Sequence, residues 1–352
     1  MRKLASVQRI WKVESIEGAD RIELVHVLGW QCVAKKGEFK KMDLCVYFEI
    51  DSFLPIEDRY EFLRSNSYKN SDILGEGFKL KTQRFKGQIS QGLVLPLSLF
   101  PELSSFTEKD LGKDVTELLH VRKWEIAERI SDSGTIIGDR PSFIPKTDET
   151  RVQACPELIN EFKGKEYYIT TKMDGSSHSV GIDEENKFHV TGHNYEYADD
   201  GKSTFYEYVK KHDIERKMRD YKNNHSEIKT FAISGEWCGE GIQKNAVGLS
   251  KPEWFVFTVY INGERLGLDD IQKIVSSLEL TMVPVEEKGT DFDKKYQTVE
   301  DLLKRAEGKY KSGKVKEGIV IRPVTPVYSK LVEGPLSMKA VSNVYLTKKH
   351  EK

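Results

Sequence analysis

The sequence contains few cysteines, and no two of the four are spaced as a Cys-x-x-C pair. A zinc ribbon or a dithiol redox site is therefore not expected. Small apolar side chains buried in a core are the better interpretation of all four positions, which are Cys32, Cys45, Cys155 and Cys238.

A long apolar run is also lacking, so no segment is expected to cross a bilayer. The first residues include basic side chains but no apolar region of the kind found in secretory signals. We therefore expect no membrane partner and an intracellular protein, cytoplasmic by default.

An excess of charge of one sign is missing too, because the formal net charge is −1. A nucleic-acid partner would have to be bound by local basic patches rather than by the chain as a whole. The 352 residues are 38% hydrophobic and 32% charged, which is typical of a soluble globular protein with two or three domains.

Short strands separated by turns dominate the N-terminal part. Runs rich in β-forming residues cover 22–27, 44–50 and, with glycines between them, 78–95. This pattern predicts a small barrel or sandwich. A turn-forming stretch at 131–134, followed by two prolines, marks a junction. We place one domain at 1–125, the junction at 126–144 and a second domain at 145–352.

The second half mixes helices and strands, which indicates an α+β class. Apolar residues have helical spacing over 205–212 and 268–278, and Thr298 with Asp301 resembles the capping box of a further helix. Strands are expected at 166–171, 177–182, 188–191, 229–234, 254–261, 318–322 and 337–341.

The sharpest local pattern is Lys172-Met173-Asp174-Gly175, directly after the first of these strands. A lysine fixed at a strand end, beside a metal and phosphates, can lose its proton and act as a nucleophile. The glycine would let the backbone approach a nucleotide closely. Taken alone, the same residues also fit an exposed strand end followed by a turn.

Later residues in a fixed order favour the nucleophile. Hydrated Mg²⁺ accepts few carboxylates, a planar base can be held between apolar side chains, and phosphates need cations. The residues suited to these three tasks are Asp174, Glu236 and Glu317 for the metal, Phe257 and Val320 for the base, and Arg322 and Lys339 for the phosphates.

With these motifs the chain resembles the covalent nucleotidyltransferases, the superfamily of RNA ligases, DNA ligases and mRNA capping enzymes. Lys172–Gly175 matches motif I, Glu236 motif III, Phe257 motif IIIa, Glu317-Gly318 motif IV, and Lys339 the second lysine of motif V. The resemblance covers residues 145 to 345, approximately.

Within the superfamily, the chain is most similar to RNA ligase family 5, which bears an N-terminal OB domain. Residues 12–55, 84–94 and 145–153 look like that family's leader domain and the start of its catalytic domain. DNA ligases and capping enzymes carry their OB domain after motif V, whereas only 13 residues follow Lys339 here.

The resemblance implies an OB-like β-barrel followed by an ATP-grasp-like domain of antiparallel sheets with flanking helices. It implies an ATP-dependent RNA ligase that carries AMP on Lys172, uses Mg²⁺ or Mn²⁺ held through water, and joins a 3′-OH to a 5′-phosphate in RNA or an RNA-containing duplex, as in nucleic-acid repair. We expect a monomer. The implied nucleotide-binding positions are Arg151, Thr170, Thr171, Gly175, Asn194, Phe257, Val320 and Arg322.

Three positions depart from the family pattern. Ser337 replaces the first lysine of motif V, Arg322 replaces the last lysine of motif IV, and His193 replaces an arginine that often precedes Asn194. Because of Ser337, the alternative that the chain is a non-catalytic protein that binds nucleic acid stays open. Two related activities also stay open, those of a DNA ligase and of a GTP-dependent capping-type enzyme.

A basic stretch with aromatic neighbours lies in the N-terminal domain. Such a stretch suits a nucleic-acid backbone, although a solvated strand face explains it equally well. If it forms one strand, its first two lysines share a face. Its members are Lys79, Lys81, Arg84 and Lys86.

Overall fold

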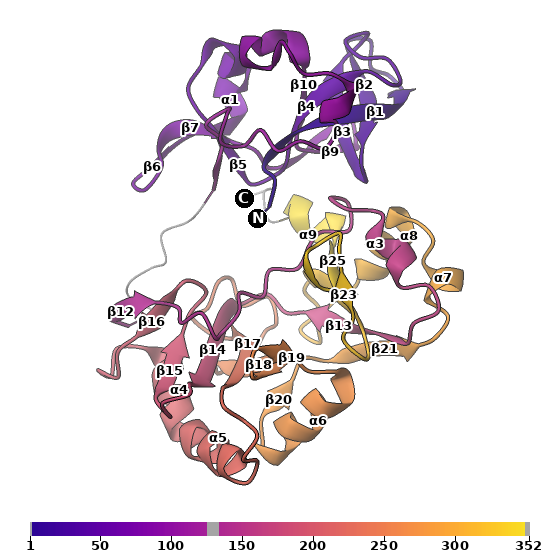
Figure 1. Ribbon diagram of the computed structural model, residues 1–352. Coiled ribbons are helices and arrows are strands. Elements are labelled where there is room, and N and C mark those ends of the chain that lie inside the picture. The colour runs from indigo at the N-terminus through magenta and orange to yellow at the C-terminus, as the bar shows by residue number, and fades with distance from the viewer. Residues whose placement is uncertain (1, 125–133, 349–352) are drawn as a thin grey trace. The chain divides into compact units, whose positions relative to one another are not determined.

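The computed structural model describes residues 2–124 and 134–348. The chain divides into two compact units, Met1–Ala127 with Leu346–Lys352, and Glu128–Tyr345 (Figure 1). Residues 126–133 of the predicted junction, and with them most of its predicted turn, lie outside the described residues. Within the described ranges, no helix has the length and apolar character needed to span a membrane.

The first unit is a half-barrel built on an antiparallel sheet of order β10-β4-β1-β2-β3. A second sheet has the order β11-β5-β7-β6, and β8 pairs with β9. The elements are β1 (Ala5–Ser15), β2 (Ile22–Val27), β3 (Trp30–Lys35), β4 (Leu44–Phe48), β5 (Ser52–Leu54), η1 (Asp58–Leu63), α1 (Arg64–Ser67), β6 (Tyr68–Ser71), β7 (Gly75–Lys79), β8 (Thr82–Phe85), β9 (Gln88–Gln91), β10 (Leu93–Pro96), η2 (Leu97–Leu99), η3 (Pro101–Leu103), η4 (Glu108–Asp110) and β11 (Arg122–Lys123).

Strand β1 curves the half-barrel because it pairs with two partners. Its first half pairs with β4 and its second half with β2, and the register with β2 shifts between Ile10 and Lys12. A bulge of this kind bends a strand and increases its twist. The predicted OB-like β-barrel is confirmed.

The second unit contains two large sheets with flanking helices, and a small sheet in which β23 pairs with β24. The larger has the order β12-β16-β15-β14-β17-β18-β19, with β20 parallel to β18, and the smaller has the order β21-β13-β22-β25. The elements are β12 (Ile136–Asp139), α3 (Leu158–Glu161), β13 (Tyr167–Lys172), β14 (Ser176–Ile182), β15 (Phe188–Thr191), β16 (Tyr195–Tyr197), α4 (Thr204–Lys211), α5 (Ile214–Asn223), β17 (Phe231–Cys238), β18 (Glu253–Ile261), β19 (Glu264–Arg265), α6 (Leu268–Ser277), β20 (Thr281–Met282), β21 (Val285–Gly289), α7 (Phe292–Lys295), α8 (Val299–Ala306), β22 (Gly318–Pro323), β23 (Tyr328–Ser329), β24 (Gly334–Pro335) and β25 (Met338–Val341). The last helix, α9 (Asn343–Lys348), begins in this unit, and its residues from Leu346 onward are assigned to the first unit.

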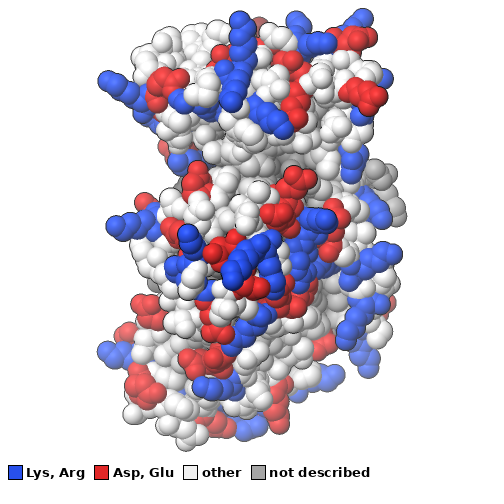
Figure 2. Space-filling model, turned by 90° about the vertical axis from the view of Figure 1, so that its right-hand side faces the viewer, with Lys and Arg blue, Asp and Glu red and all other residues white. Residues whose placement is uncertain are grey.

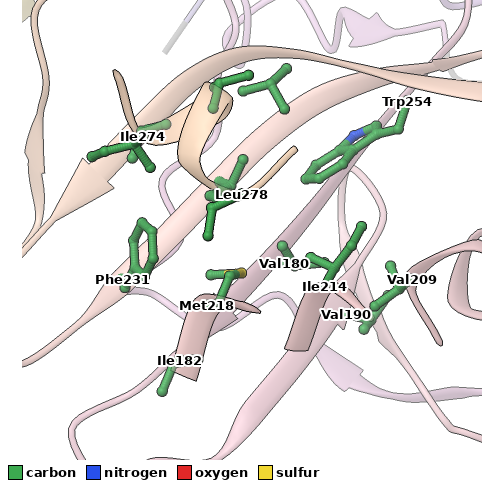
Figure 3. Close-up of a cluster of buried hydrophobic side chains, with 14 of the residues drawn as sticks. Val180, Ile182, Val190, Val209, Ile214, Met218, Phe231, Trp254, Ile274 and Leu278 are labelled. Carbon is green, nitrogen blue, oxygen red and sulfur yellow. The ribbon is translucent and has the colours of Figure 1, made fainter. Parts of the chain in front are cut away.

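Helices α4, α5 and α6 pack on the larger sheet and bury its main core (Figure 3). Val180 of β14, Phe231 of β17 and Trp254 of β18 contribute the sheet side, while Met218 and Ile274 come from two of the helices. Burial of each large apolar side chain stabilises the fold by about 1.5–3 kcal/mol. This core holds β14, β17 and β18 in a fixed arrangement.

Arg140 ties the segment ahead of β13 to the larger sheet. Its guanidinium donates hydrogen bonds to the carbonyls of Ile144 (2.9 Å), Pro145 (2.8 Å) and Gly192 (2.8 Å), and to the Ser179 hydroxyl (2.9 Å). A half-buried guanidinium needs several acceptors, and here they come from three separate parts of the chain. The segment that follows Arg140 is therefore held against the sheet before β13 begins.

The predicted α+β class is confirmed, and each predicted strand of the second unit overlaps an observed one. The capping box is present too, because Thr298 accepts from the Asp301 amide and the Asp301 side chain accepts from the Thr298 amide. Helix α5 was not predicted, since few of its ten residues are apolar.

Acidic and basic side chains are interspersed on the face of the molecule that Figure 2 shows. Cys32, Cys45 and Cys238 are buried and Cys155 is half-buried, all as free thiols.

Candidate active site

A pocket of about 180 Å³ lies between the two sheets of the second unit. Strands β13, β22 and β25 form one wall, and β14, β17 and β18 form the other. Most of the predicted catalytic and nucleotide-binding residues lie on these walls, namely Thr170, Thr171, Lys172, Glu236, Phe257, Val320, Arg322 and Lys339.

Strand register explains why residues far apart in sequence meet on the first wall. Thr170 pairs with Val320, Val320 pairs with Lys339, and Lys172 pairs with Gly318. Because alternate residues of a strand face the same side, Thr170 and Lys172 point alike, as do Val320 and Arg322. The sheet therefore presents the lysine of motif I beside Val320 and Lys339.

The second wall is organised around β17. Glu236 pairs with Ser177 of β14 and with Phe255 of β18. The register between β17 and β18 shifts between Ser234 and Gly235, directly before the glutamate. Such a bulge re-aims the side chains that follow it.

Lys172 lies at an acidic end of the pocket. Its Nζ is 2.8 Å from Oε2 of Glu317. Burial lowers the pKa of this amine, but the negative charges of Glu317 and Glu236 outweigh that effect, so its pKa is raised above the ordinary value. In this state the amine is an ammonium and cannot act as a nucleophile.

Glu236 is the carboxyl group of the acidic end whose pKa is raised. Burial raises its pKa to about 8; Glu317 and Asp174 add to the rise and Lys172 opposes it. Among the residues described, no group of three or more His, Cys, Asp or Glu side chains is close enough to hold a metal directly. The positive charge of the Lys172 ammonium instead lies among three carboxylates, those of Glu317, Glu236 and Asp174. These carboxylates fit a divalent metal ion that would be held through water.

Lys339 has a pKa lowered to about 8, because it is buried and lies near Lys172 and Arg151. Its backbone is fixed on both sides: its carbonyl accepts from the Val152 amide at 2.9 Å, and its amide donates to the Thr150 carbonyl at 2.8 Å. This β-bridge places Arg151 beside Lys339, although Arg151 is not part of the pocket walls.

A basic end of the pocket surrounds Glu149. The Arg322 guanidinium donates to Oε1 of Glu149 at 2.5 and 3.1 Å, and Arg265 lies 3.8 Å from the same oxygen. Burial raises the pKa of Glu149, but the two arginines and the Ser337 hydroxyl lower it below the ordinary value. Arg322 also donates to the Phe257 carbonyl at 2.5 Å.

Several predicted residues lie outside the pocket walls. These are Arg151, Asp174, Gly175, Asn194 and Glu317. The Asn194 side chain accepts a hydrogen bond from Lys146 at 2.9 Å. A Cβ on Gly175 would lie 2.3 Å from the Trp237 carbonyl oxygen. The close approach that requires this glycine is therefore to β17.

Other wall residues were not predicted from the sequence. One group lies in the segment 145–153, which resembles the family but was assigned no chemical role, and consists of Thr147, Asp148 and Glu149. The remaining wall residues are Met173, Ser177, His193 and Val283. Ser177 has a buried hydroxyl without a hydrogen-bond partner among the described residues. His193 lies 3.5 Å from Asp148 across the pocket rim. Met173 and His193 stand at motif positions but were assigned no chemical role, whereas no spacing in the sequence distinguishes Ser177 and Val283 from ordinary strand and loop residues.

The basic stretch of the first unit does not form a single strand. Strand β7 ends at Lys79 and β8 begins at Thr82, so Lys79 and Lys81 do not share one face of a continuous strand. The Lys79 ammonium lies 4.7 Å from the centre of the Trp124 ring. Arg84 donates to the Gly87 carbonyl at 3.1 Å, and Lys86 occupies the tight turn with φ 48°.

An OB-like half-barrel followed by a two-sheet unit with a lysine-bearing pocket defines an enzyme with a nucleotidyltransferase-type fold. Family models agree, since an OB-fold domain matches residues 4–97 and RNA ligase matches residues 165–341. The chain belongs to the RNA ligase family. The predicted resemblance is thereby confirmed.

Solved structures of Naegleria gruberi RNA ligase are similar over the full length. The form with PPi is 35% identical, with 100% of this chain and 99% of that chain covered and a TM-score of 0.86. A mutant with AMP and Mn is 34% identical and one with ATP and Mn is 33% identical, each with 99% of both chains covered and a TM-score of 0.87. No curated protein matches the chain.

Proposed function

We propose that this protein is an ATP-dependent RNA ligase that works through AMP bound covalently to Lys172. In the first step, Nζ of Lys172 attacks the α-phosphorus of ATP, a P–N bond forms, and pyrophosphate leaves. In the second step AMP passes to a 5′-phosphate. In the third, a 3′-hydroxyl attacks that activated phosphate, and AMP leaves as the phosphodiester forms.

The observation that carries the proposal is the amine of Lys172 on a pocket wall, surrounded by Glu317, Glu236 and Asp174. A resting ammonium must lose its proton and its partner before it can attack. A divalent ion held through water by these carboxylates would supply the replacing positive charge and offset charge on the phosphates. The relatives solved with ATP and Mn, and with AMP and Mn, support both ligands.

The remaining pocket residues suit a nucleotide. Phe257 and Val320 offer apolar surface for a base, with Thr170 and Thr171 beside it. Lys339 is placed to offset phosphate charge, while the Arg322 guanidinium already binds Glu149 and the Phe257 carbonyl. We assign Arg322 to the nucleotide through the part of its side chain that lines the pocket.

The proposed substrate is a nick or break in a duplex whose 3′-OH strand is RNA, bound in part by Lys79, Lys81, Arg84 and Lys86. A monomeric state and a cytoplasmic location remain predictions. The rival activities differ in measurable ways, because a DNA ligase would seal a nick with a DNA 3′-OH equally well and a capping-type enzyme would take GTP.

The test is intact-protein mass after incubation with ATP or GTP and either Mg²⁺ or Mn²⁺. We expect one added AMP with ATP, none with GTP, and none on Lys172→Ala. Lys163→Ala, which changes an exposed lysine of the same unit, should keep the adduct. A folded wild-type protein that never gains AMP would refute the activity, whereas AMP on another side chain would refute only the site.

A further inference from the structure

Tyr310 lies outside the pocket walls but contacts both charged partners of the acidic end. It follows α8 in a tight turn. The Tyr310 amide donates to the Lys314 carbonyl at 2.9 Å, and the Gly313 amide donates to the Tyr310 carbonyl at 2.9 Å. Its side chain is only 8% exposed and packs in a small core with Met173 and Phe255.

The Tyr310 hydroxyl joins the two strands that carry the acidic end. It donates to the Lys172 carbonyl at 2.7 Å and accepts from the Glu317 amide at 3.0 Å. The paired residues of β13 and β22 end at Lys172 and Gly318. The hydroxyl therefore stands immediately beyond the last pair, where it satisfies both backbone groups and lets the strands separate.

This link fixes the backbone at Lys172 and Glu317 without depending on their charges. Their side chains form an ion pair of 2.8 Å, and that pair must break when the amine becomes a nucleophile. After it breaks, the Tyr310 hydroxyl still holds both main chains. An attacking amine must be placed within a fraction of an ångström of its target.

The turn that carries Tyr310 is itself anchored. The Ser312 hydroxyl donates to the Ala246 carbonyl at 2.8 Å, and the Lys314 ammonium donates to the Asn245 carbonyl at 3.0 Å. These contacts connect the turn to the loop after β17, so Tyr310 is supported from outside the two strands that it joins.

We propose that Tyr310 is a positioning residue for the first step, acting through Lys172 and Glu317; the inference rests on the function proposed above. Its hydroxyl sets the spacing between the nucleophile and the carboxylate while the amine changes charge. An ordinary core tyrosine would contribute to stability through its ring and would leave the rate of adduct formation unaffected.

The test measures single-turnover formation of the AMP adduct at saturating ATP and its dependence on ATP concentration. Tyr310→Phe should lower the maximal rate about tenfold and leave the half-saturating ATP concentration within about twofold. Tyr296→Phe is the matched control, because Tyr296 is as buried a residue as Tyr310 and its hydroxyl donates to Glu287 at 2.7 Å, outside the pocket walls. It should lose stability and keep its maximal rate.

A maximal rate within twofold of wild type for Tyr310→Phe would overturn the inference, as would an equal loss of rate in Tyr296→Phe. If Tyr310→Phe does not fold, Ser312→Ala takes its place, and it should lower the maximal rate about two- to threefold by loosening the turn; an unchanged rate there also overturns the inference. A wild-type protein without adduct refutes the proposed function instead, so the two failures are distinct.

Discussion

The two ends of the pocket resolve the same problem, buried charge, in opposite ways. At the acidic end one ammonium faces Glu317, Glu236 and Asp174. At the basic end one carboxylate, Glu149, receives two arginines and a serine hydroxyl. The acidic end therefore has negative charge left over, whereas the basic end has its single carboxylate fully compensated.

This difference separates a site prepared for a ligand from a structural contact. Burial, together with the negative charges of Glu317 and Asp174, raises the pKa of Glu236. The excess of carboxylates makes the acidic end receptive to a cation, at a cost to the stability of the free protein. The paired charges of the basic end instead connect the segment before β13 to Phe257 on the opposite sheet. Three substitutions test whether stability and catalysis divide in this way.

The largest expected effect is on stability at the basic end. Arg322→Met leaves the buried Glu149 with Arg265, at 3.8 Å, and the Ser337 hydroxyl, and should lower the free energy of unfolding by about 3 kcal/mol. Unfolding in urea, monitored by hydrogen exchange of backbone amides in the second unit, measures this loss of stability. Glu149→Gln keeps a neutral acceptor and should cost less. Similar stability of Arg322→Met and wild type would contradict the structural role of this end.

The second expected effect is on rate at the acidic end. Glu317→Gln removes charge but little volume, and should slow AMP-adduct formation about 100-fold, as the loss of a preorganised electrostatic contact does. Because it also relieves crowding among carboxylates, its free energy of unfolding should match or exceed that of wild type. Rapid-quench kinetics measure the rate of adduct formation, and urea unfolding measures the free energy of unfolding. A variant that loses stability and keeps its rate would reverse the comparison.

The smallest expected effect is a pH-dependent gain of stability in Glu236→Gln. The pKa of Glu236 is raised to about 8 in the folded protein, so between its ordinary value and pH 8 the unfolded chain is charged while the folded one is neutral. Wild type therefore loses stability as the pH rises through this window, and the glutamine variant does not.

The melting temperature of Glu236→Gln should match that of wild type near pH 4.5 and exceed it by about 2–4 °C, or about 1 kcal/mol, one pH unit higher. The difference should widen further toward pH 8. Glu240→Gln, at an exposed position after the same strand, should show no such trend. A difference between the two proteins that stays constant from pH 4.5 to pH 8 would mean that the carboxylate is ionised in the folded protein throughout this window.

The fold was largely predictable because its signals are local. Alternating apolar residues, turn residues and the Thr298 capping box each act within a few positions of the chain. The boundary of β17 was not, since strand pairing extends it to Cys238 beyond the predicted 234. That extension depends on partners in β14 and β18.

The pocket was predictable only where a motif marks it. Lys172, Phe257 and Lys339 stand in recognisable strings, and the structure brings them to one cavity. Tyr310 stands in no such string, and Glu149 stands in a stretch that resembles the family without indicating a chemical role for this residue. Their importance arises from hydrogen bonds that cross 138 residues from Tyr310 to Lys172 and 173 residues from Arg322 to Glu149. No spacing rule covers contacts at that separation.

The anchoring of Arg140 has a practical consequence for dissecting the enzyme. Its hydrogen bonds to Ile144 and Pro145 on one side and Gly192 on the other make it part of the second unit's framework, although it precedes position 145. A shortened protein that starts at 145 would leave the Gly192 carbonyl without its guanidinium donor and release the strand-proximal segment bearing Glu149. Fragments intended for adenylation assays should therefore begin upstream of Arg140.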